Sequence, residues 1–514
     1  MIAPDITPLF RLFAKWRLRK LLTMDGVTIQ AQNLARLLAK AQNTRFGKDH
    51  AFATIKTVAD YQKAVPLRRY EDFWRDYWQG AFPVLHNITW PGKVPFFALT
   101  SGTSTGATKY IPCTWEMIRA NRKAALDIFV WHLYHEPQFR PFAGKTFILG
   151  GSTDLTRQAK GVHSGDLSGI AAKTMPVWAR AYAFPDTKLA LLANWDEKLE
   201  KLAQASLREP IRVLSDTPSW LVLLFEKVLA LRQAMHDFRP AFPDLELLIH
   251  GGVSFAPYRE RFQRYLQPTG AKRREVYPAS EGFIGIADQG PDDGLRLMLD
   301  HGIFYEFVPL EELNTSHPRR FWLKTIETGV DYAIVLSTHA GLWADIIGDT
   351  VRFVERDPPR FYVTGRTSYM LSGFGEHVLG EEIEEAVLAA VRRFHLQVYE
   401  FCVGTDYPQH TATGCHIYLL ECNPCPTDLA ERQTLATQLA ESIDRYLQQR
   451  NADYRVHREG KQLSMPQVML VKPGAFTAWM RARGTLGGQH KVPRVLQDQE
   501  LFQSMCAFLQ HLHS

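Results

Sequence analysis

The segment Thr100-Ser-Gly-Thr-Ser-Thr-Gly-Ala-Thr-Lys has the composition of a phosphate-binding loop. Its glycines let the backbone fold so that several N–H groups point into one concavity, and its hydroxyl groups add further donors. The residues that can contact an anion are Ser101, Gly102, Thr103, Ser104, Gly106 and Lys109. Lys109 lies three residues after Gly106, so this is not a Walker A loop, whose lysine follows the glycine directly. The segment predicts a polyphosphate site, with a solvated Ser/Thr/Gly turn as the alternative.

A second candidate segment, Tyr277-Pro-Ala-Ser-Glu281, ends a β-rich run. The aromatic ring of Tyr277 can stack on a base, and the carboxylate oxygens of Glu281 suit Mg²⁺. Ser280 adds a hydroxyl beside that carboxylate. A buried tyrosine and a glutamate at the start of a helix explain the same pentapeptide equally well, so by itself it leaves both interpretations open.

Three further positions carry charge in glycine-containing segments. Asp349 follows Gly348 and precedes a strand expected at residues 351–354, where its carboxylate can accept hydrogen bonds from both ribose hydroxyls; an ordinary turn is the alternative. Arg366 follows Gly365, and its planar guanidinium suits ribose or phosphate oxygens. Lys491 lies in the glycine-rich segment 484–494, which we expect to be mobile and able to carry the lysine into a site.

The elements that must position these residues form an α/β pattern followed by an α+β pattern. A chain of 514 residues predicts more than one domain. Residues up to about 46 are expected to be helical, with a break at 66–70. β-Rich runs at 96–100, 146–149, 245–249, 275–277, 305–308 and 332–336 then alternate with amphipathic stretches such as 220–238 and 257–266. After Arg366, a helix at 381–393, paired strands at 398–403 and 414–420, and a helix at 428–450 indicate a separate module. We therefore predict domains at 1–370 and 371–514, with the junction near 367–375.

The composition is that of an ordinary globular protein, with 46% hydrophobic and 22% charged residues. A net charge of +6 over this length gives no indication of a nucleic-acid partner. Six cysteines are too few for a disulfide scaffold, and residues 402–425 contain a single CxxC where a zinc ribbon needs two. The sequence shows no secretory signal and no apolar run of transmembrane length. We expect a cytoplasmic monomer that acts on small molecules.

The N-terminal segment 9–22, LFRLFAKWRLRKLL, combines apolar and basic residues at helical spacing. We expect its leucine and phenylalanine face to pack on the domain and its basic face to be solvated. A position on an anionic membrane surface is the alternative, which we do not favour.

Taken in order, these segments resemble the adenylate-forming superfamily and, more closely, the GH3 family of acyl acid–amido synthetases. The family's Ser-Ser-Gly-Thr-Ser-x-Gly-x-x-Lys loop is matched with Thr100 for its first serine, and its Tyr-x-x-Ser-Glu is matched at 277–281. Shorter matches at 46–48, 65–67, 70–72, 250–254, 304–309 and 489–494 extend the resemblance over nearly the whole chain. One departure is clear: the plant pattern Tyr-Arg-x-Gly-Asp reads Asp345-Ile346-Ile-Gly-Asp349 here.

The resemblance implies a large N-terminal α/β adenylate-forming domain and a small, mobile C-terminal α+β domain. It implies that a carboxylic acid reacts with Mg²⁺-ATP to give acyl-AMP, and that an amine, usually an amino acid, then displaces AMP. Lys109 and the 101–106 loop would contact the β,γ-phosphates, and Glu281 would hold Mg²⁺. Gly251, Gly252 and Tyr277 would line the adenine slot, and Asp349 would bind the ribose. Arg366 and Lys491 would be catalytic residues: Arg366 would reach ribose or phosphate, and Lys491 would act on the charge that develops during adenylation.

Two other functions share these residues. A ligase of the same superfamily passes the acyl group to coenzyme A, and a non-catalytic nucleotide-binding protein can retain the fold. The acid itself is unspecified. Residues 161–169 form a polar, glycine-rich stretch that we expect to be a loop near the acyl pocket, where His163 is a candidate contact for a carboxylate.

Overall fold

The structure is a computed structural model of the 514-residue chain. It describes all residues except 1–2, 102–107, 151–154, 191, 193–194, 233–237, 253–254, 256–257, 291, 368–369, 372–375, 377, 407–413, 460–462, 484–491 and 513–514. Two compact units divide the chain. Unit 1 comprises Met1–Thr100, Thr108–Ile347 and Val351–Tyr362, and unit 2 comprises Ser101–Ala107, Gly348–Thr350 and Val363–Ser514. This division lies at 362/363, before the boundary that we predict at 370.

Unit 1 begins with a series of helices, some of which start at residues that the sequence marks as caps. They are α1 (Thr7–Leu22), α2 (Gly26–Ala41), α3 (Arg45–Asp49), η1 (Phe52–Thr54), α4 (Val58–Ala64), α5 (Tyr70–Phe73) and the π-helical turn η2 (Trp74–Trp78). The Asp25 carboxylate accepts the Thr28 N–H at the start of α2, and Thr57 and Asp60 form a capping box at the start of α4. The predicted helical N-terminus and the break between α4 and α5 are confirmed.

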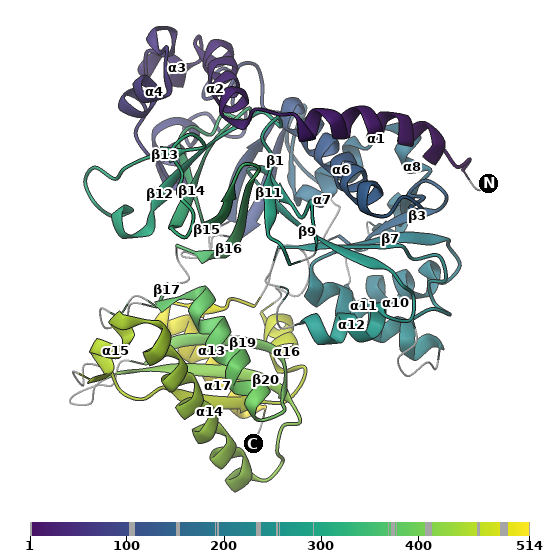
Figure 1. Cartoon of the computed structure of the whole chain (residues 1–514), viewed down its shortest axis with the longest axis vertical. Helices are drawn as coiled ribbons and strands as arrows, with labels where there is room; N and C mark the ends of the chain where they lie inside the picture. Colours follow the sequence, from purple (N-terminus) through teal and green to yellow (C-terminus); the bar gives the residue numbers. More distant parts are fainter. Residues whose placement is uncertain are drawn as a thin grey trace. The chain divides into compact units, whose positions relative to one another are not determined.

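A twelve-stranded mixed sheet forms the centre of unit 1 (Figure 1). Its order is β13-β12-β14-β15-β16-β11-β10-β9-β8-β7-β3-β6. The strands are β3 (Lys145–Ile148), β6 (Ala183–Phe184), β7 (Ile211–Asp216), β8 (Leu247–Gly251), β9 (Lys272–Ala279), β10 (Gly282–Ile286), β11 (Leu295–Leu297), β12 (Ile303–Pro309), β13 (Phe321–Trp322), β14 (Asp331–Thr338), β15 (Asp345–Arg356) and β16 (Pro359–Arg366). Strands β9, β8, β7, β3 and β6 are parallel, whereas β9–β10, β10–β11, β11–β16, β12–β13 and β12–β14 pair antiparallel.

The parallel half of the sheet carries the helices that the alternating pattern predicts. They are α6 (Trp115–His135), α7 (Leu167–Thr174), α8 (Val177–Arg180), α9 (Thr187–Ala190), α10 (Trp195–Ser206), α11 (Pro218–Arg232) and α12 (Arg259–Leu266). A short 3-10 turn, η4 (Leu310–Glu312), follows β12. The α/β prediction for the first domain is therefore confirmed, and its six predicted strands correspond to β1, β3, β8, β9, β12 and β14.

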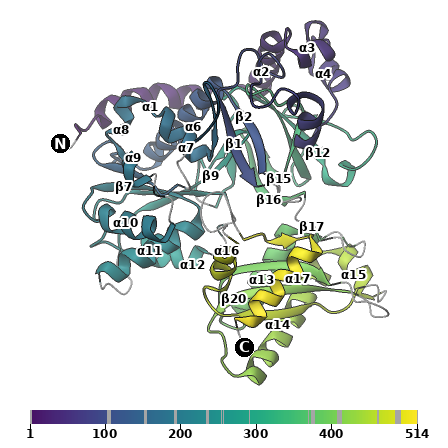
Figure 2. The same ribbon diagram turned by 180° about the vertical axis from the view of Figure 1, so that it is seen from behind.

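A second sheet of unit 1 holds the segment around the predicted phosphate loop. Its order is β2-β1-β5-β4, built from β1 (Phe96–Ser101), β2 (Thr108–Cys113), β4 (Thr156–Ala159) and β5 (Val162–Gly165) (Figure 2). The expected loop around His163 is wrong: the residue lies in β5, pairs with β1, and its ring lies 6.0 Å from that of Phe96. Strand β2 is an additional element between the predicted phosphate loop and α6.

Unit 2 is an α+β module, as predicted. Its strands are β17 (Met370–Leu371), β18 (Val378–Leu379), β19 (Gln397–Asp406), β20 (Cys415–Asn423), β21 (Gln467–Val471) and β22 (Val495–Leu496), and its helices are α13 (Gly380–Arg393), α14 (Leu429–Arg450), α15 (Ala452–Glu459), α16 (Ala475–Ala482) and α17 (Gln499–His511). The sheet has the order β21-β20-β19-β22, and a separate core packs on each of its two faces. Phe401 and Val403 belong to the core with α13 and α14, whereas Cys402 between them belongs to the core with α16 and α17. This is the two-residue alternation of a strand.

Helix α1 only partly matches the expected packing. Phe10, Ala14 and Leu21 are buried, but Leu9, Leu12 and Trp16 are exposed. The expected packing of α1 on the domain is confirmed for Phe10, Phe13, Leu18 and Leu21, and Arg11, Lys15 and Arg19 are exposed as expected. Leu9 and Leu12 do not belong to the packed face. None of the helices in the described part of the chain combines the length and the apolar composition needed to span a bilayer.

Candidate active site

Lys109 lies at the start of β2, where helix α5 packs against the strand. Its Nζ is 2.7 Å from Glu71 Oε1 and 5.2 Å from the centre of the Tyr70 ring. The Tyr70 hydroxyl oxygen accepts the Tyr110 N–H at 2.9 Å, which fixes α5 on β2. Burial raises the pKa of Glu71, but the hydrogen bond from Lys109 outweighs this and lowers it overall. Glu71 thus holds the lysine in a defined place beside the end of the predicted phosphate loop.

Asp345, at the start of β15, is a buried carboxyl group in the same region of unit 1. Its side chain is 3% exposed, and its Oδ1 has no hydrogen-bond partner among the described residues. Backbone hydrogen bonds from Arg68 N to Ala344 O and from Ile346 N to Arg68 O hold the strand on both sides of it. Burial and then the negative charge of Glu281 raise the pKa of Asp345 well above its usual value, and the charge of Lys109 opposes them. Asp345, Glu281, Glu71 and Lys109 therefore share one electrostatic environment.

The raised pKa predicts how Asp345 affects stability. The folded protein holds this proton more tightly than the unfolded chain, so stability falls as pH rises from 3.8 through the folded pKa. Each unit by which the pKa is raised contributes about 1.4 kcal/mol to that fall. Asparagine has no titratable proton. The free energy of unfolding of Asp345→Asn should therefore decrease less steeply with pH, so the variant becomes more stable relative to the parent as pH rises. The measurement is the denaturant midpoint of the parent and of the variant at several pH values between about 4 and 8. If the two midpoints change with pH in the same way, the prediction is wrong.

Tyr277 lies in β9, and Ser280 and Glu281 form the turn that joins β9 to β10. Tyr277 is largely buried, and its ring meets that of Phe361 at 6.2 Å with an edge-on geometry. Ser280 and Glu281 are half-buried in the turn. Glu281 therefore belongs to the turn of a strand–turn–strand and not to the start of a helix. From this turn its negative charge raises the pKa of Asp345.

Gly251 is the last residue of the parallel strand β8, and Gly252 follows it. A Cβ on Gly251 would lie 2.1 Å from the backbone oxygen of Val276 in β9, and Gly252 has φ +82°. The close approach of two strands thus explains the glycine at 251, independently of any adenine contact. Gly252 adopts a conformation that side-chain-bearing residues rarely accept.

Gly251→Ala should consequently destabilise the protein by about 1–3 kcal/mol, because the backbone atom that it meets cannot rotate away. The decrease is measured as a shift of the denaturant midpoint. Gly80→Ala is the matched control, since a Cβ at Gly80 meets nothing within 4 Å. Equal midpoints for the two variants would show that β8 moves to accommodate the methyl group.

Asp349 and Arg366 belong to unit 2. Arg366 Nε donates to Asp349 Oδ1 at 2.6 Å, and Thr367 N donates to Gly348 O at 2.7 Å. Gly348 has φ +90°, so the chain bends within β15 just before Asp349. The expected loop–strand junction is wrong here, because Asp349 lies inside a strand that begins at Asp345. The pair joins the facing ends of β15 and β16 and presents a carboxylate whose orientation is fixed by a guanidinium.

The remaining predicted residues are only partly visible. The backbone of Ser101 ends β1, while Gly102, Thr103, Ser104, Gly106 and Lys491 lie outside the described residues. In unit 1 the charges of Lys109 and Glu281 both act on Asp345, and in unit 2 Arg366 contacts Asp349 directly. Glu71 had no separate signal in the sequence beyond its place in Tyr70-Glu-Asp, and Asp345 stood out only as a departure from the plant pattern.

Known protein domains match the chain in sequence order. The GH3 family N-terminal domain matches residues 18–161 and 152–270, the GH3 family central domain matches 296–366, and the GH3 family C-terminal domain matches 381–500. Among curated relatives, indole-3-acetic acid-amido synthetase GH3.3 of Arabidopsis thaliana is 26% identical over 235 residues. That alignment covers 43% of this chain and 38% of the relative, so the chain spans about two-fifths of its length.

Solved structures share the fold over a larger part of the chain. The GH3.15 acyl acid amido synthetase superposes with a TM-score of 0.79 at 17% identity, covering 99% of this chain and 97% of that protein. A 2-hydroxyisobutyryl-CoA ligase, in complex with its 2-HIB-AMP adenylate, superposes with a TM-score of 0.61 at 16% identity, covering 94% and 91%. The fold of a large α/β domain followed by a smaller α+β domain is that of these adenylate-forming enzymes.

Proposed function

Since this chain belongs to the GH3 family, we propose that it is an ATP-dependent ligase that activates a carboxylic acid as acyl-AMP and transfers the acyl group to an amine, forming an amide. The observation that carries the proposal is the match of all three GH3 domains, in order, to residues 18–500. The charged environment of Lys109, Glu281 and Asp345 supports it, because adenylation needs both a cation and carboxylate ligands near a polyphosphate.

In the first half-reaction a carboxylate oxygen of the acid bonds to the α-phosphorus of ATP. The bond from that phosphorus to the bridging oxygen breaks, and pyrophosphate leaves with the electron pair. Lys109, oriented by Glu71 and by its position over Tyr70, places a positive charge next to the loop that would hold the phosphates. Negative charge that accumulates on the phosphoryl oxygens is thereby stabilised.

The carboxylates fit a divalent cation. Mg²⁺ prefers oxygen ligands, and the buried Oδ1 of Asp345 has no hydrogen-bond partner among the described residues. Glu281 would hold the ion, with Asp345 as the neighbouring carboxylate. When bound, Mg²⁺ neutralises phosphate charge and makes pyrophosphate a better leaving group.

Asp349 suits the ribose. A carboxylate accepts hydrogen bonds from two vicinal hydroxyls, and Arg366 fixes its orientation through the 2.6 Å contact. The adenine contacts of Gly251, Gly252 and Tyr277 stay proposals. Lys491 is assigned, on the sequence resemblance alone, to the charge that develops during adenylation.

In the second half-reaction the amine nitrogen bonds to the carbonyl carbon of acyl-AMP. The bond from that carbon to the phosphate oxygen breaks, AMP leaves, and the nitrogen loses a proton to solvent. An amino acid is the proposed acceptor, following the amido synthetase name of the relative. Transfer to coenzyme A is the second candidate, favoured by the fold shared with the 2-hydroxyisobutyryl-CoA ligase.

The test is ATP–pyrophosphate exchange by purified protein with Mg²⁺ and a panel of aromatic, indole, short-chain and fatty acids, without an amine. We expect exchange with one class of acid and its loss in Asp349→Ala, which removes the ribose contact. Amino acids and coenzyme A are then added separately, and amide or thioester is identified by mass spectrometry. Absence of both exchange and ATP binding across the panel would overturn the proposal, and thioester without amide would favour the coenzyme A ligase.

A further inference from the structure

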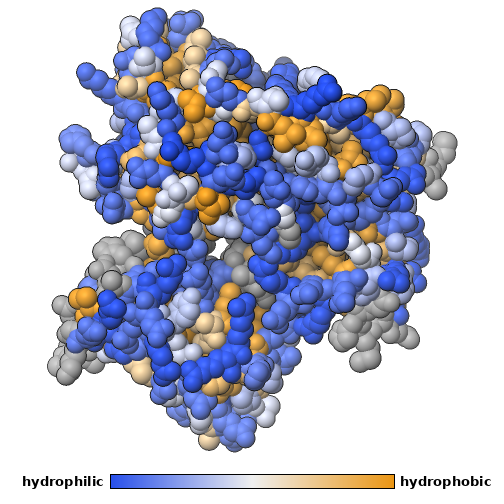
Figure 3. All heavy atoms as spheres, viewed as in Figure 1, coloured by the Kyte–Doolittle hydropathy of each residue, from blue (hydrophilic) through white to orange (hydrophobic). Residues whose placement is uncertain are grey.

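Helix α1 exposes an apolar stripe on the surface of unit 1. Leu9, Leu12 and Trp16 are 68%, 71% and 61% exposed. Their spacing of three and four residues places them on one face of the helix. In the space-filling view, hydrophobic residues interrupt the hydrophilic surface where α1 lies (Figure 3). A contiguous exposed group of this kind indicates an interaction site, whereas singly scattered apolar residues do not.

The stripe is distinct from the face that anchors the helix. Phe10 and Leu21 are buried, and Phe10 packs on Phe142 with ring centres 5.3 Å apart. Arg17, on the same buried side, forms ion pairs with Asp127 and Asp300 at 2.7 Å. Helix α1 is thus fixed on the domain by one face while the other presents leucine and tryptophan to solvent.

The charges around the stripe have one sign. Arg11, Lys15, Arg19 and Lys20 are exposed, and the helix contains no acidic residue. Lysine and arginine beside exposed leucine and tryptophan are the composition of a helix that lies in a membrane interface. Nucleic acid would match the charge but would leave the leucines exposed, and a second copy of α1 would bring two positively charged helices together.

Helix α8 exposes a second apolar group on unit 1. Trp178 in α8 is 51% exposed, Val177 is exposed beside it, and Arg180 adds a further cation. The Trp178 ring lies 6.2 Å from that of Phe142, which also contacts Phe10. Because Phe10 belongs to the face that anchors α1, this chain of rings leads to the buried side of α1, and Trp178 is separate from the exposed stripe.

We propose that the exposed face of α1 binds the face of an anionic lipid bilayer, with α1 parallel to the membrane plane. Leu9, Leu12 and Trp16 enter the boundary between headgroups and acyl chains, and Arg11, Lys15 and Arg19 contact anionic headgroups. The proposal is independent of the enzyme's reaction. It adds to the packing of α1 on the domain the membrane-surface alternative that the sequence analysis stated for residues 9–22.

The test is co-sedimentation of the full-length protein with phosphatidylcholine vesicles that contain, or lack, about 30% phosphatidylserine, since surface charge of this order attracts basic segments. We expect binding to the anionic vesicles, weakened by added salt, and little binding to phosphatidylcholine alone. The double variant Leu12→Ser/Trp16→Ser should lower the partition coefficient at least about tenfold, because two side chains no longer transfer from water. Leu429→Ser is the matched control, since Leu429 is equally exposed but lies on α14 of unit 2.

Three results would overturn the proposal: no binding of the parent to anionic vesicles, binding by the double variant equal to that of the parent, or a loss of binding in Leu429→Ser equal to that in the double variant. Light scattering adds a further one: if the parent self-associates through this surface and the double variant does not, while neither binds vesicles, the partner is a second copy. Unchanged denaturant midpoints establish that the double variant is folded.

Discussion

Replacing Glu281 with glutamine should lower the rate of ATP–pyrophosphate exchange by about 10²–10³-fold, the typical cost of removing one preorganised electrostatic contact in an active site. Glutamine keeps the size of the side chain and can still accept a hydrogen bond, but it loses the negative charge that a divalent cation requires. The half-buried turn between β9 and β10 holds both side chains in the same way, so the change isolates the charge. Exchange at a series of Mg²⁺ concentrations measures it, and the remaining activity should need more Mg²⁺.

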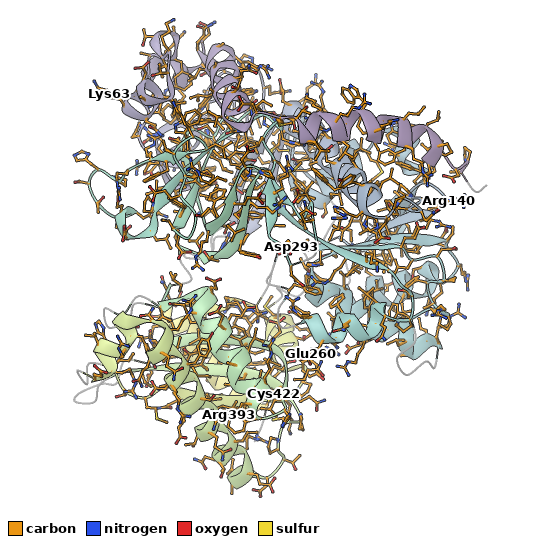
Figure 4. The ribbon with its side chains drawn as sticks, viewed as in Figure 1. Lys63, Arg140, Glu260, Asp293, Arg393 and Cys422 are labelled. Carbon is orange, nitrogen blue, oxygen red and sulfur yellow. The ribbon has the colours of Figure 1, made fainter. Side chains whose placement is uncertain are left out.

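The control for this charge is Glu260→Gln. Glu260 lies exposed on α12, where Figure 4 labels it, and the change removes the same charge from the same unit. We expect its exchange rate to equal that of the parent. A normal rate and normal Mg²⁺ dependence in Glu281→Gln would contradict the metal assignment and leave Asp345 as the carboxylate to test.

Glu281→Gln also tests the electrostatic link to Asp345. The charge of Glu281 is the second cause, after burial, of the raised pKa of Asp345. Its removal should therefore bring that pKa closer to 3.8, so the fall of stability with pH becomes smaller. The same pH series that tests Asp345→Asn would show this.

The sequence predicted those helices and strands whose pattern lies in neighbouring residues. In unit 2, the alternation around Cys402 and the amphipathic helix α14, capped by Asp428, define strands and helix from neighbouring residues alone. Strand β2 did not give such a signal. It is an edge strand that contains Pro112, and proline is tolerated at an edge but is atypical of strands elsewhere.

The site was harder to predict because its members meet only in the fold. Lys109 was identified from its own loop, but its partner Glu71 lies on a different element, 38 positions earlier in the chain. Asp345 differs from the plant pattern, yet nothing local indicates that it is buried or that Glu281 acts on it. Long-range pairing of this kind depends on strand order, and the antiparallel half of the large sheet has no signature in residue spacing.

The other large effect concerns stability: Arg17→Met should lower the free energy of unfolding by about 3–5 kcal/mol, the usual cost of removing one partner from a buried ion pair. Arg17 donates two hydrogen bonds to Asp127 and two to Asp300, all between 2.7 and 2.8 Å. Asp127 is fully buried, so methionine would leave it with His301 alone, at 3.1 Å.

The pKa of Asp300 shows how strongly this network is held. Burial raises the pKa of that carboxyl, but hydrogen bonds from Arg17 and the charges of His301 and Lys123 outweigh it and lower the pKa. A lowered pKa stabilises the fold above 3.8 and ceases to do so as pH falls through the folded value. The destabilisation by Arg17→Met should thus be largest near neutral pH and smaller in acid.

Arg19→Met is the matched control, since Arg19 lies on the same helix but is exposed, and we expect it to change the denaturant midpoint by less than about 0.5 kcal/mol. Asp127, Asp300 and His301 also place ligand atoms within 4.8 Å of one another, which on spacing alone suits a metal. Arg17 and Lys123 already supply the positive charge there, at 2.7 Å from Asp300. A chelator should therefore leave the denaturant midpoint of the parent unchanged. If instead chelator lowers the midpoint and Arg17→Met does not, the carboxylates of Asp127 and Asp300 bind a metal ion and are not held mainly by Arg17 of α1.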